Sequence, residues 1–293
     1  MLCYNTLNEH YRRRFGCKVY KLSLDGGFTC PNRDGTKGVG GCVFCSDGSG
    51  SFAEKISDGG IEKALERAKQ RVEGKNRSGK YIAYFQSFSS TYEKTERLRE
   101  LFEQALAPDY IVGLAVATRP DCLPDKTVEM LGRLARRKPI SVELGLQTVN
   151  GDSIKYIGRG FENEEYFSAV RRLHAVGVEV VTHIILGLPR ETADDAVATT
   201  RAAVLAGTDG VKFHTLHVLK GTRLADDYKR GMFDCMTLEE YAEALRLCIK
   251  ELPDSTVVHR ITGDGAKRDL IAPLWTADKK RTLNFLYKYL EES

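Results

Sequence analysis

The chain has 293 residues, of which 42% are hydrophobic and 29% charged, and its formal net charge is +4. A chain of this length buries a core without disulfide or metal staples, and its composition excludes disorder as the main state. The first residues form no apolar run, and the longest apolar stretch, 176–189, is interrupted by Glu179 and His183. We therefore expect a cytoplasmic protein with no signal peptide and no membrane partner. In that compartment, eight cysteines indicate metal binding or chemistry rather than disulfides.

Short apolar runs alternate with amphipathic stretches along the chain. The runs predict strands at residues 19–24, 81–86, 110–117, 141–146, 178–186 and 211–216, with a seventh at 256–261. The amphipathic stretches predict helices at residues 61–72, 94–106, 125–136, 162–175, 193–206, 238–251 and 278–290. Continuous apolar strands favour a parallel sheet covered by helices, either as a partial barrel or as an open sheet. In both architectures, reactive residues belong at the carboxyl ends of the strands.

The strongest signal is a cysteine loop that follows the first predicted strand. Cys30, Cys42 and Cys45 have the spacing C-x11-C-x2-C, and six glycines lie between Gly26 and Gly41. A structural zinc site needs four ligands, so a fourth would have to come from Cys3, Cys17 or a distant histidine. An iron–sulfur cluster with three protein thiolates instead leaves one iron open for a further ligand. Spacing alone leaves both interpretations open.

This loop, with its Cys-x-aromatic-Cys ending, resembles that of the radical S-adenosylmethionine (radical SAM) superfamily. Further motifs resemble the bacterial YhcC/YtqA-type branch, which is related to the catalytic subunit of Elongator; they lie at residues 26–36, 142–148, 183–189 and 260–264. The resemblance implies an α/β fold, a partial (β/α)6 TIM-like barrel. We expect the barrel over residues 1–255 and a short C-terminal extension packed on it over residues 256–293. The chain is too short for Elongator's acetyltransferase domain, so acetyl transfer is not expected.

The resemblance also implies the cofactors. Cys30, Cys42 and Cys45 would hold a 4Fe-4S cluster, and SAM would bind its open iron and be cleaved to a 5′-deoxyadenosyl radical. Phe44 would cover the cluster and offer backbone groups to adenine, which Gly187 would also hold through its backbone. An electron donor such as flavodoxin or ferredoxin is an expected partner.

Several polar side chains are candidates for binding SAM. The second predicted strand ends in Gln86, Ser87 and Ser89, where many relatives have a glutamate; Ser89 alternatively caps the following helix. Glu143 lies within an apolar strand, where a charge needs a partner: either SAM, with help from Gln147, or a buried salt bridge. Arg159 resembles the arginine that pairs with the SAM carboxylate, and the alternative is an exposed surface charge.

Other residues are candidates for handling the substrate. His183 would lie near the reaction site if its face of the strand points into the barrel, and the alternative is a satisfied core histidine. Arg260 and Asp264 are candidates for substrate recognition or proton handling. His214 and His217 point to opposite faces, so at most one would reach a substrate.

The resemblance suggests tRNA as the partner and the C5 side chain of a wobble uridine as the target. Basic clusters at residues 12–14, 75–80, 136–138 and 279–281 would together contact its phosphates; the alternative for each single cluster is a charged surface that keeps the protein in solution. Two alternatives remain at this point: a radical SAM enzyme acting on a small metabolite, and a non-catalytic, zinc-stabilised RNA-binding protein.

Overall fold

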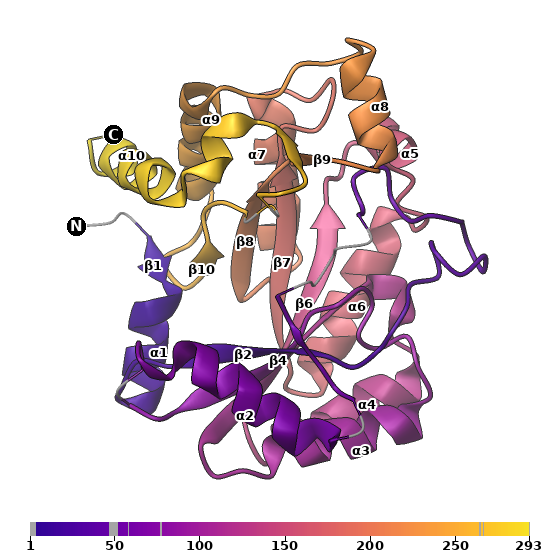
Figure 1. The fold of residues 1–293 in the computed structure, drawn as a ribbon, viewed down its shortest axis with the longest axis vertical. Helices are drawn as coiled ribbons and strands as arrows, with labels where there is room; N and C mark the ends of the chain where they lie inside the picture. Colours follow the sequence, from indigo (N-terminus) through magenta and orange to yellow (C-terminus); the bar gives the residue numbers. More distant parts are fainter. Residues whose placement is uncertain are drawn as a thin grey trace.

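A computed structural model describes residues 4–46, 52–57, 59–76, 78–263, 265 and 267–292. Within these ranges, nine parallel strands form one curved sheet in the order β1-β10-β8-β7-β6-β5-β4-β2-β3 (Figure 1). The strands are β1 (Asn5–Thr6), β2 (Tyr20–Asp25), β3 (Glu54–Lys55), β4 (Tyr81–Phe85), β5 (Ile111–Thr118), β6 (Ile140–Gln147), β7 (Glu179–Leu186), β8 (Gly210–Thr215) and β10 (Val257–Arg260). A small antiparallel sheet joins β9 (Val218–Leu219) to β11 (Leu270–Ala272). The predicted α/β partial barrel is confirmed.

All seven predicted helices are present, with boundaries that differ from the prediction by one residue at most. They are α2 (Gly60–Glu73), α3 (Thr95–Leu106), α4 (Asp125–Ala135), α6 (Asn163–Ala175), α7 (Ala193–Leu205), α9 (Leu238–Lys250) and α10 (Lys279–Glu291). The beginning of α9 has a local cause: Thr237 and Glu240 form a capping box there. Sequence reasoning missed α1 (Leu7–Phe15), α5 (Gly151–Ile157), α8 (Arg223–Lys229) and the short 3-10 turns η1 (Pro120–Cys122) and η2 (Leu274–Ala277).

The two faces of the sheet have different chemistry. Side chains such as Leu22, Val142 and Val211 point outward and join the large apolar core under the helices. Their strand neighbours Lys21, Glu143 and Lys212 contact one another on the opposite face, inside the barrel. Because successive side chains of a strand alternate between faces, the apolar core and the polar interior come from the same strands.

Helix α1 closes the amino end of the barrel interior. Tyr11 of α1 packs against Val19, Ile82, Tyr84 and alanines of β5, and Leu7 and Phe15 join the same apolar cluster. These three α1 residues recur every four positions, which places them on one face of the helix. The helix therefore closes the interior at the end opposite to the carboxyl edge of the strands. We call it the α1 plug.

The expected division into a barrel over 1–255 and an extension over 256–293 stays a prediction. Strand β10 joins the main sheet beside β8, and α10 packs against α9. In the part of the chain that the structure describes, no helix is both long and apolar enough to cross a membrane.

Candidate functional site

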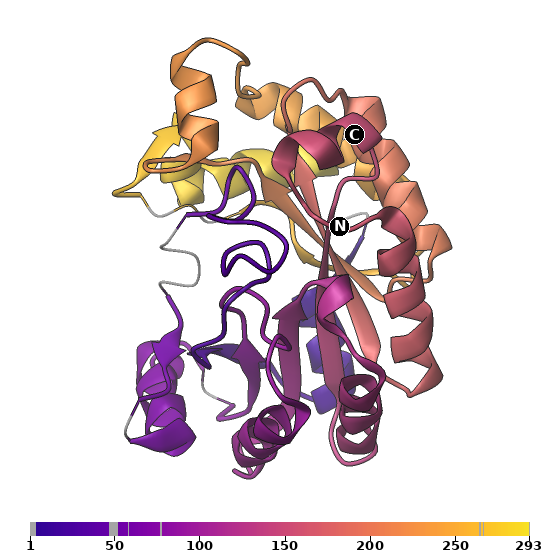
Figure 2. The same cartoon turned by 90° about the vertical axis from the view of Figure 1, so that its right-hand side faces the viewer.

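The cysteine loop leaves the carboxyl end of β2 and lies against the other half of the barrel (Figure 2). Two main-chain hydrogen bonds hold its second half: Val43 N–H donates to Ile157 O at 3.0 Å, and Leu224 N–H donates to Val43 O at 3.0 Å. Arg223 also donates to Gly41 O at 3.1 Å. Phe44 packs on the apolar cluster formed by these elements. The loop is thus tied to α5 and α8, far along the sequence.

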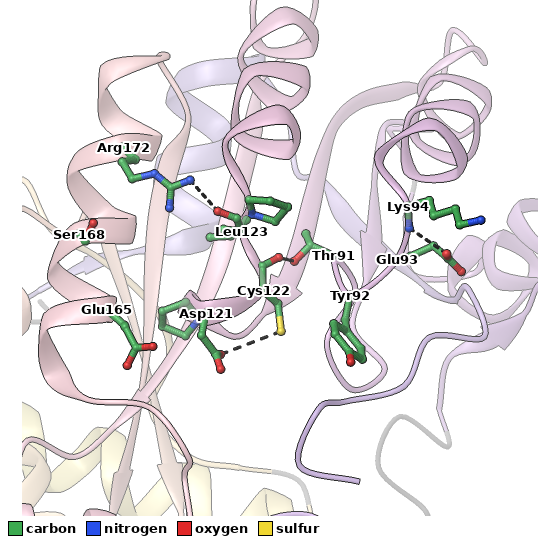
Figure 3. Close-up of a pocket in the computed structure, with 12 residues that line it drawn as sticks. Thr91, Tyr92, Glu93, Lys94, Asp121, Cys122, Leu123, Glu165, Ser168 and Arg172 are labelled. Carbon is green, nitrogen blue, oxygen red and sulfur yellow. Dashed lines mark hydrogen bonds between the residues drawn. The ribbon is translucent and has the colours of Figure 1, made fainter. Parts of the chain in front are cut away.

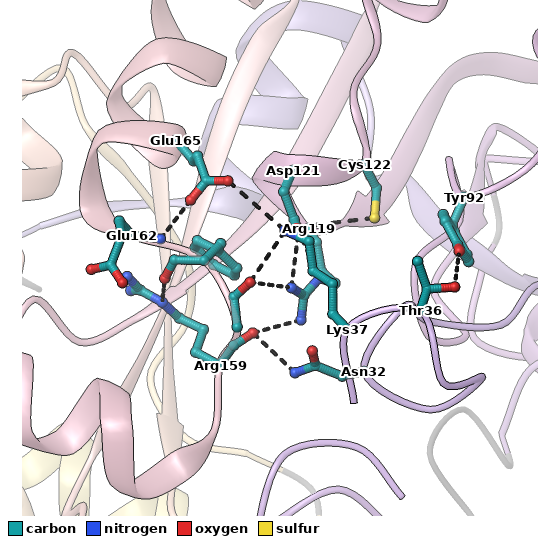
Figure 4. Close-up of polar contacts among 12 residues, drawn as sticks. Asn32, Thr36, Lys37, Tyr92, Arg119, Asp121, Cys122, Arg159, Glu162 and Glu165 are labelled. Carbon is teal, nitrogen blue, oxygen red and sulfur yellow. Dashed lines mark hydrogen bonds and ion pairs between the residues drawn. The ribbon is translucent and has the colours of Figure 1, made fainter. Parts of the chain in front are cut away.

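Asn32 fastens the first half of the loop. Its side chain is buried, and its amide Nδ2 donates to Gly158 O at 2.7 Å and to Arg159 O at 3.0 Å (Figure 4). Gly160 has a φ of +74°, and a Cβ there would lie 2.6 Å from Asn32 Oδ1. Any side chain at position 160 would therefore collide with the amide that holds the loop.

The three loop thiols lie close enough to influence one another. Burial raises the pKa of Cys42 to about 11; the Asn32 amide opposes this, whereas nearby Cys45 and Cys30 add to it. Asn32 Nδ2 lies 3.5 Å from Cys42 Sγ, and an Arg33 guanidinium nitrogen lies 3.4 Å from Cys45 Sγ. N–H donors aimed at two of the sulfurs suit thiolates that carry the negative charge of a cluster. The residues present therefore fit a three-thiolate iron–sulfur cluster.

Cys17, one of the candidates for a fourth zinc ligand, does not lie near the loop cysteines. Cys17 precedes β2 and packs with the α1 plug, whereas Cys30 follows the other end of the same strand. Six residues of strand span roughly 20 Å, so Cys17 is out of reach. Among the residues that the structure places, no group of three or more His, Cys, Asp or Glu is arranged to hold a single metal ion. Cys3 lies outside the described residues.

A charge network that sequence reasoning missed joins this loop to β5. Arg119 donates to both carboxylate oxygens of Asp121, at 2.9 and 2.8 Å, and to Arg159 O at 2.8 Å. Lys37 of the cysteine loop reaches the same carboxylate at 2.7 Å (Figure 4). Burial alone would raise the pKa of Asp121, but Arg119 and Lys37 outweigh it and lower that pKa. The sequence signal was a charged pair directly after an apolar strand.

The side chain of Arg159 is not exposed on the surface. It is also not free to bind SAM, because it is used within the protein. Its side chain is almost fully buried, and it donates to three main-chain oxygens, of Phe161 at 3.0 Å and of Leu146 and Thr148 at 2.8 Å each. A fourth bond, at 2.9 Å, goes to Asn163 Oδ1. Four of the five N–H groups of a guanidinium are thus used within the protein. The surface-charge alternative is wrong, and the SAM-carboxylate role stays a prediction that this geometry does not favour.

The polar residues after β4 are better placed to receive a ligand. The buried Ser87 hydroxyl has no hydrogen-bond partner within the described structure, and a buried hydroxyl without a partner is costly. The next residue, Phe88, has a left-handed φ of +54°, which bends the chain at this edge. Ser89 does not cap α3, because the N-cap of that helix is Lys94. Ser87 and its neighbour Gln86 remain candidates for binding SAM.

Glu143 is the centre of a buried ion-pair cluster, the alternative that the sequence offered for it. Lys21 Nζ lies 2.6 Å from its Oε1, while Tyr84 OH at 2.6 Å and His183 Nε2 at 2.9 Å contact Oε2. Lys212 also pairs with Oε2. We call Lys21, Tyr84, Glu143, His183 and Lys212 the interior cluster. His183 therefore points into the barrel, which is the condition that the sequence analysis set for a place near the reaction site. A SAM contact by Glu143 stays a prediction.

The charges of the interior cluster are strongly coupled. Burial alone would raise the pKa of Glu143, but Lys21 and Lys212 outweigh it and lower that pKa well below its usual value. Burial lowers the pKa of Lys212 to about 7, against the attraction of Glu143. Burial also lowers the pKa of His183. Sequence reasoning found Glu143 but missed Lys212, although both interrupt an apolar strand with a charge.

The remaining candidates that the structure describes lie around the carboxyl edge of the strands. Gln147 has a φ of +64°, and its amide, in the orientation that satisfies its neighbours, donates to Gly145 O at 3.1 Å and Leu146 O at 3.0 Å. Gly187, at the end of β7, has a φ of +86° and faces the Met236 side chain. Arg260 ends β10, and Asp264 lies outside the described residues. The proposed roles of these residues stay predictions.

A cleft of about 680 Å³ opens on the outer side of the same edge (Figure 3). It lies among the loops after β4 and β5 and the side chains of α6, with Tyr92, Asp121 and Arg172 on its walls. None of the three loop cysteines lines it. The cleft therefore neighbours the cysteine loop without containing its thiols.

Comparison with known proteins decides the family. Residues 30–203 match the model of the Radical SAM superfamily, and residues 208–292 match the Radical_SAM C-terminal domain. The chain belongs to the radical SAM superfamily. Radical SAM proteins are enzymes that use a 4Fe-4S cluster and SAM, so both cofactors and the enzymatic class are established. The non-catalytic zinc alternative is wrong.

Relatives of this radical SAM enzyme confirm the predicted branch. It is 44% identical over 289 residues to the uncharacterized protein YtqA of Bacillus subtilis, covering 98% of this chain and 89% of that protein. It is 36% identical to the protein YhcC of Escherichia coli, covering 98% of this chain and 92% of that protein. A tRNA uridine(34) acetyltransferase of Methanocaldococcus infernus is 25% identical to this chain over 209 residues. The matched stretch covers 70% of this chain and 37% of that protein. The solved structure of archaeal Elp3 from the same organism shares the fold, with a TM-score of 0.67 and 17% identity over 94% of this chain and 63% of that one.

Proposed function

We propose that this radical SAM enzyme modifies tRNA at the C5 side chain of a wobble uridine. The observation that carries the proposal is the similarity to a tRNA uridine(34) acetyltransferase across 70% of this chain. Because the chain spans 37% of that protein, we carry over the substrate class and not the acetyl transfer.

The residues of this chain have separable tasks in the proposed reaction. When bound, the cluster and SAM supply a 5′-deoxyadenosyl radical. Cys30, Cys42 and Cys45 hold the cluster, while Asn32 fixes the loop on which they lie. Ser87 offers an unsatisfied hydroxyl to a polar group of SAM. The α1 plug covers the amino end of the barrel with apolar side chains, which would limit the access of water to a radical formed inside.

The basic residues that would contact tRNA differ from those first expected. The clusters at 75–80 and 136–138 directly precede β4 and β6, and residues 12–14 lie on the α1 plug, so three of the four expected clusters are at the amino end; the fourth, at 279–281, begins α10 and stays a prediction. Lys138 donates to three main-chain oxygens there. We therefore propose a carboxyl-edge basic set that follows β2, β7, β9 and β10, composed of Arg33, Arg190, Lys220, Arg223, Lys229, Arg230, Lys267 and Arg268.

An acidic one-electron donor, such as flavodoxin or ferredoxin, is the second proposed partner. Reduction of the cluster requires the donor to approach the cysteine loop. The loop presents Val39, which is 82% exposed, in the same segment as the basic residues Arg33 and Lys37. An exposed apolar residue in a basic segment suits a weak, charge-steered encounter with an acidic protein.

Nucleoside analysis of tRNA from a deletion strain tests the tRNA proposal. We expect one modified wobble uridine to disappear and a precursor to accumulate, with both effects reversed by the native gene. A gene that encodes Cys42→Ala is the matched control and should not restore the modification. An unchanged nucleoside profile would instead favour a small metabolite as the substrate.

A further inference from the structure

The guanidinium of Arg33 lies against the sulfur of one loop cysteine. Its Nη1 donates to Cys45 Sγ at 3.4 Å and to Gly40 O at 3.4 Å. The main-chain N–H of Arg33 donates to Cys30 O at 2.8 Å, so the residue is fixed in the turn that begins at the first loop cysteine. Arg33 and Cys45 are both half-buried. Partial burial matters here because an N–H···S contact that is shielded from water is stronger than one on the open surface.

Two further features keep the guanidinium in this place. It lies over the ring of Phe88, 5.0 Å from the ring centre, which is a cation–π distance. Phe88 reaches this position with a left-handed φ of +54°, which is uncommon for a residue with a side chain. Gly41 has a φ of +85°, and a Cβ there would lie 3.2 Å from both Arg33 Nη1 and Cys45 Cβ. Gly41 therefore leaves room for the guanidinium beside the sulfur, and Phe88 supports it there.

A donor at a cluster sulfur changes how easily the cluster is reduced. Reduction adds one electron, and thus one negative charge, to the cluster, and the one-electron donor supplies that electron. A hydrogen bond from a cationic group to a cluster sulfur stabilises the more negative state and so raises the reduction potential. Asn32 is aimed at Cys42 in the same way, but its Nδ2 also donates to two main-chain oxygens that hold the loop. Substitution of Asn32 would therefore disturb the loop as well as the sulfur.

We propose that Arg33 raises the reduction potential of the cluster through its hydrogen bond to the sulfur of Cys45. Arg33 is thus a positioning residue, because it acts on the cluster through one of the thiolates that hold it. The proposal rests on Cys45 as a cluster ligand and does not depend on tRNA as the substrate. Arg33 also belongs to the carboxyl-edge basic set, so the test is made without tRNA and without SAM.

A redox titration of the anaerobically reconstituted holoenzyme, followed by electron paramagnetic resonance of the reduced cluster, tests this. We expect the equilibrium constant for reduction to fall at least tenfold in Arg33→Leu, which corresponds to a potential lower by ~59 mV for one electron. Phe88→Leu leaves the cysteine loop intact but removes the ring that supports the guanidinium, and it should lower the same constant at least threefold. Iron and sulfide analysis verifies that each variant holds its cluster.

Arg223 provides a matched control. Its guanidinium donates to Gly41 O at 3.1 Å, so it brings the same charge to the same loop, but this bond goes to a main-chain oxygen and not to a sulfur. Arg223→Leu should therefore leave the reduction potential unchanged. An equal shift in Arg223→Leu and Arg33→Leu would mean that the charge around the loop sets the potential, and it would overturn the role of the hydrogen bond.

The remaining outcomes separate this proposal from the assignments on which it builds. An unchanged potential in Arg33→Leu with a full cluster would overturn it. If Arg33→Leu does not hold a cluster, Phe88→Leu decides: a lowered potential supports the proposal, and an unchanged potential or a lost cluster overturns it. A cluster retained in Cys45→Ala would overturn it by removing the ligand through which Arg33 acts. A lowered potential with an unaltered tRNA profile in the deletion strain would support the role of Arg33 and contradict only the proposed substrate.

Discussion

The side-chain amide of Asn32 donates to the main-chain oxygen of Arg159 at 3.0 Å, although 127 positions separate the two residues. This contact lets the loop that bears the thiols rest on the turn after α5. Asn32→Ala should therefore keep all three cysteines but make the loop that carries them less rigid. We expect faster loss of iron from the reconstituted enzyme in air and a decrease of about 1 to 3 kcal/mol in the free energy of unfolding.

Asn76→Ala is the control for that variant. Asn76 is also buried and donates to Lys80 O at 3.0 Å, but it lies in the turn before β4. A similar loss of stability with normal iron retention is expected. If both variants lost iron at the same rate, the Asn32 effect would be a general consequence of destabilisation.

The iron content of alanine variants should distinguish the three loop cysteines from the other cysteines of the chain. Cys30→Ala, Cys42→Ala and Cys45→Ala should each lose the cluster and SAM cleavage, because a thiolate ligand is removed. Cys17→Ala should keep both, since Cys17 lies at the other end of β2. Iron and sulfide analysis after anaerobic reconstitution measures this, and loss of the cluster in Cys17→Ala would revive a fourth protein ligand.

Arg159→Ala should mainly destabilise the fold. It would leave the main-chain oxygens of Leu146, Thr148 and Phe161 buried without donors. Each such loss costs about 1 to 3 kcal/mol, so denaturant unfolding should show a loss of at least about 3 kcal/mol. A variant of near-native stability that no longer binds SAM would instead establish the SAM-carboxylate role.

Glu143 should make stability depend on pH under acidic conditions. Its pKa in the folded protein is well below the usual 4.5, because Lys21 and Lys212 outweigh the burial that would raise it. The stabilisation is thus complete above about pH 4.5 and is lost as the pH falls towards the folded pKa. Urea unfolding between pH ~3 and ~7 measures this. The groups that face this carboxylate are Lys21, Tyr84, His183 and Lys212.

Glu143→Gln tests whether this group is responsible. The variant should lose roughly 3 to 5 kcal/mol at neutral pH, as expected when a buried ion pair is broken. Below about pH 4.5 its stability should fall less steeply than that of the native protein. Equal slopes would mean that other carboxylates dominate acid unfolding.

Binding of tRNA should depend on the carboxyl-edge basic set. Arg190→Glu combined with Arg268→Glu should weaken binding and reduce the salt slope by about 1 per removed phosphate contact. Arg136→Glu combined with Arg137→Glu alters the same charge at the amino end of the barrel and should bind normally. Titration at several salt concentrations distinguishes the two, and the reverse result would restore the cluster at 136–138 as the contact surface.

Much of the fold was predictable because its strands are uninterrupted apolar runs. β4, β5 and β7 begin and end within one residue of their predicted limits, and the helices between them follow. Helix α1 was missed because Arg12, Arg13 and Arg14 suggested a basic cluster, although Leu7, Tyr11 and Phe15 form an apolar stripe. Two-residue strands such as β1 exist only through pairing with a distant strand, so no local pattern identifies them.

The site was predictable where chemistry fixes the residue type and not where packing decides. Cysteine spacing singled out the loop that we propose holds the cluster, and a charge in an apolar strand singled out Glu143. Arg159 lies in a Gly-Arg-Gly segment that has the composition of a surface loop. Its burial depends on main-chain oxygens of β6 and the loop after it, which only the tertiary structure brings together.

The α1 plug has a consequence for the order of events during turnover. With the amino end covered by Tyr11 and Phe15, we expect ligands to enter and leave by the carboxyl edge. A macromolecule seated on that edge blocks the passage for anything smaller. We therefore expect SAM to bind before such a substrate, and 5′-deoxyadenosine and methionine to leave after the modified product has dissociated. Product inhibition by 5′-deoxyadenosine should accordingly be competitive with SAM, and excess tRNA added first should slow SAM binding.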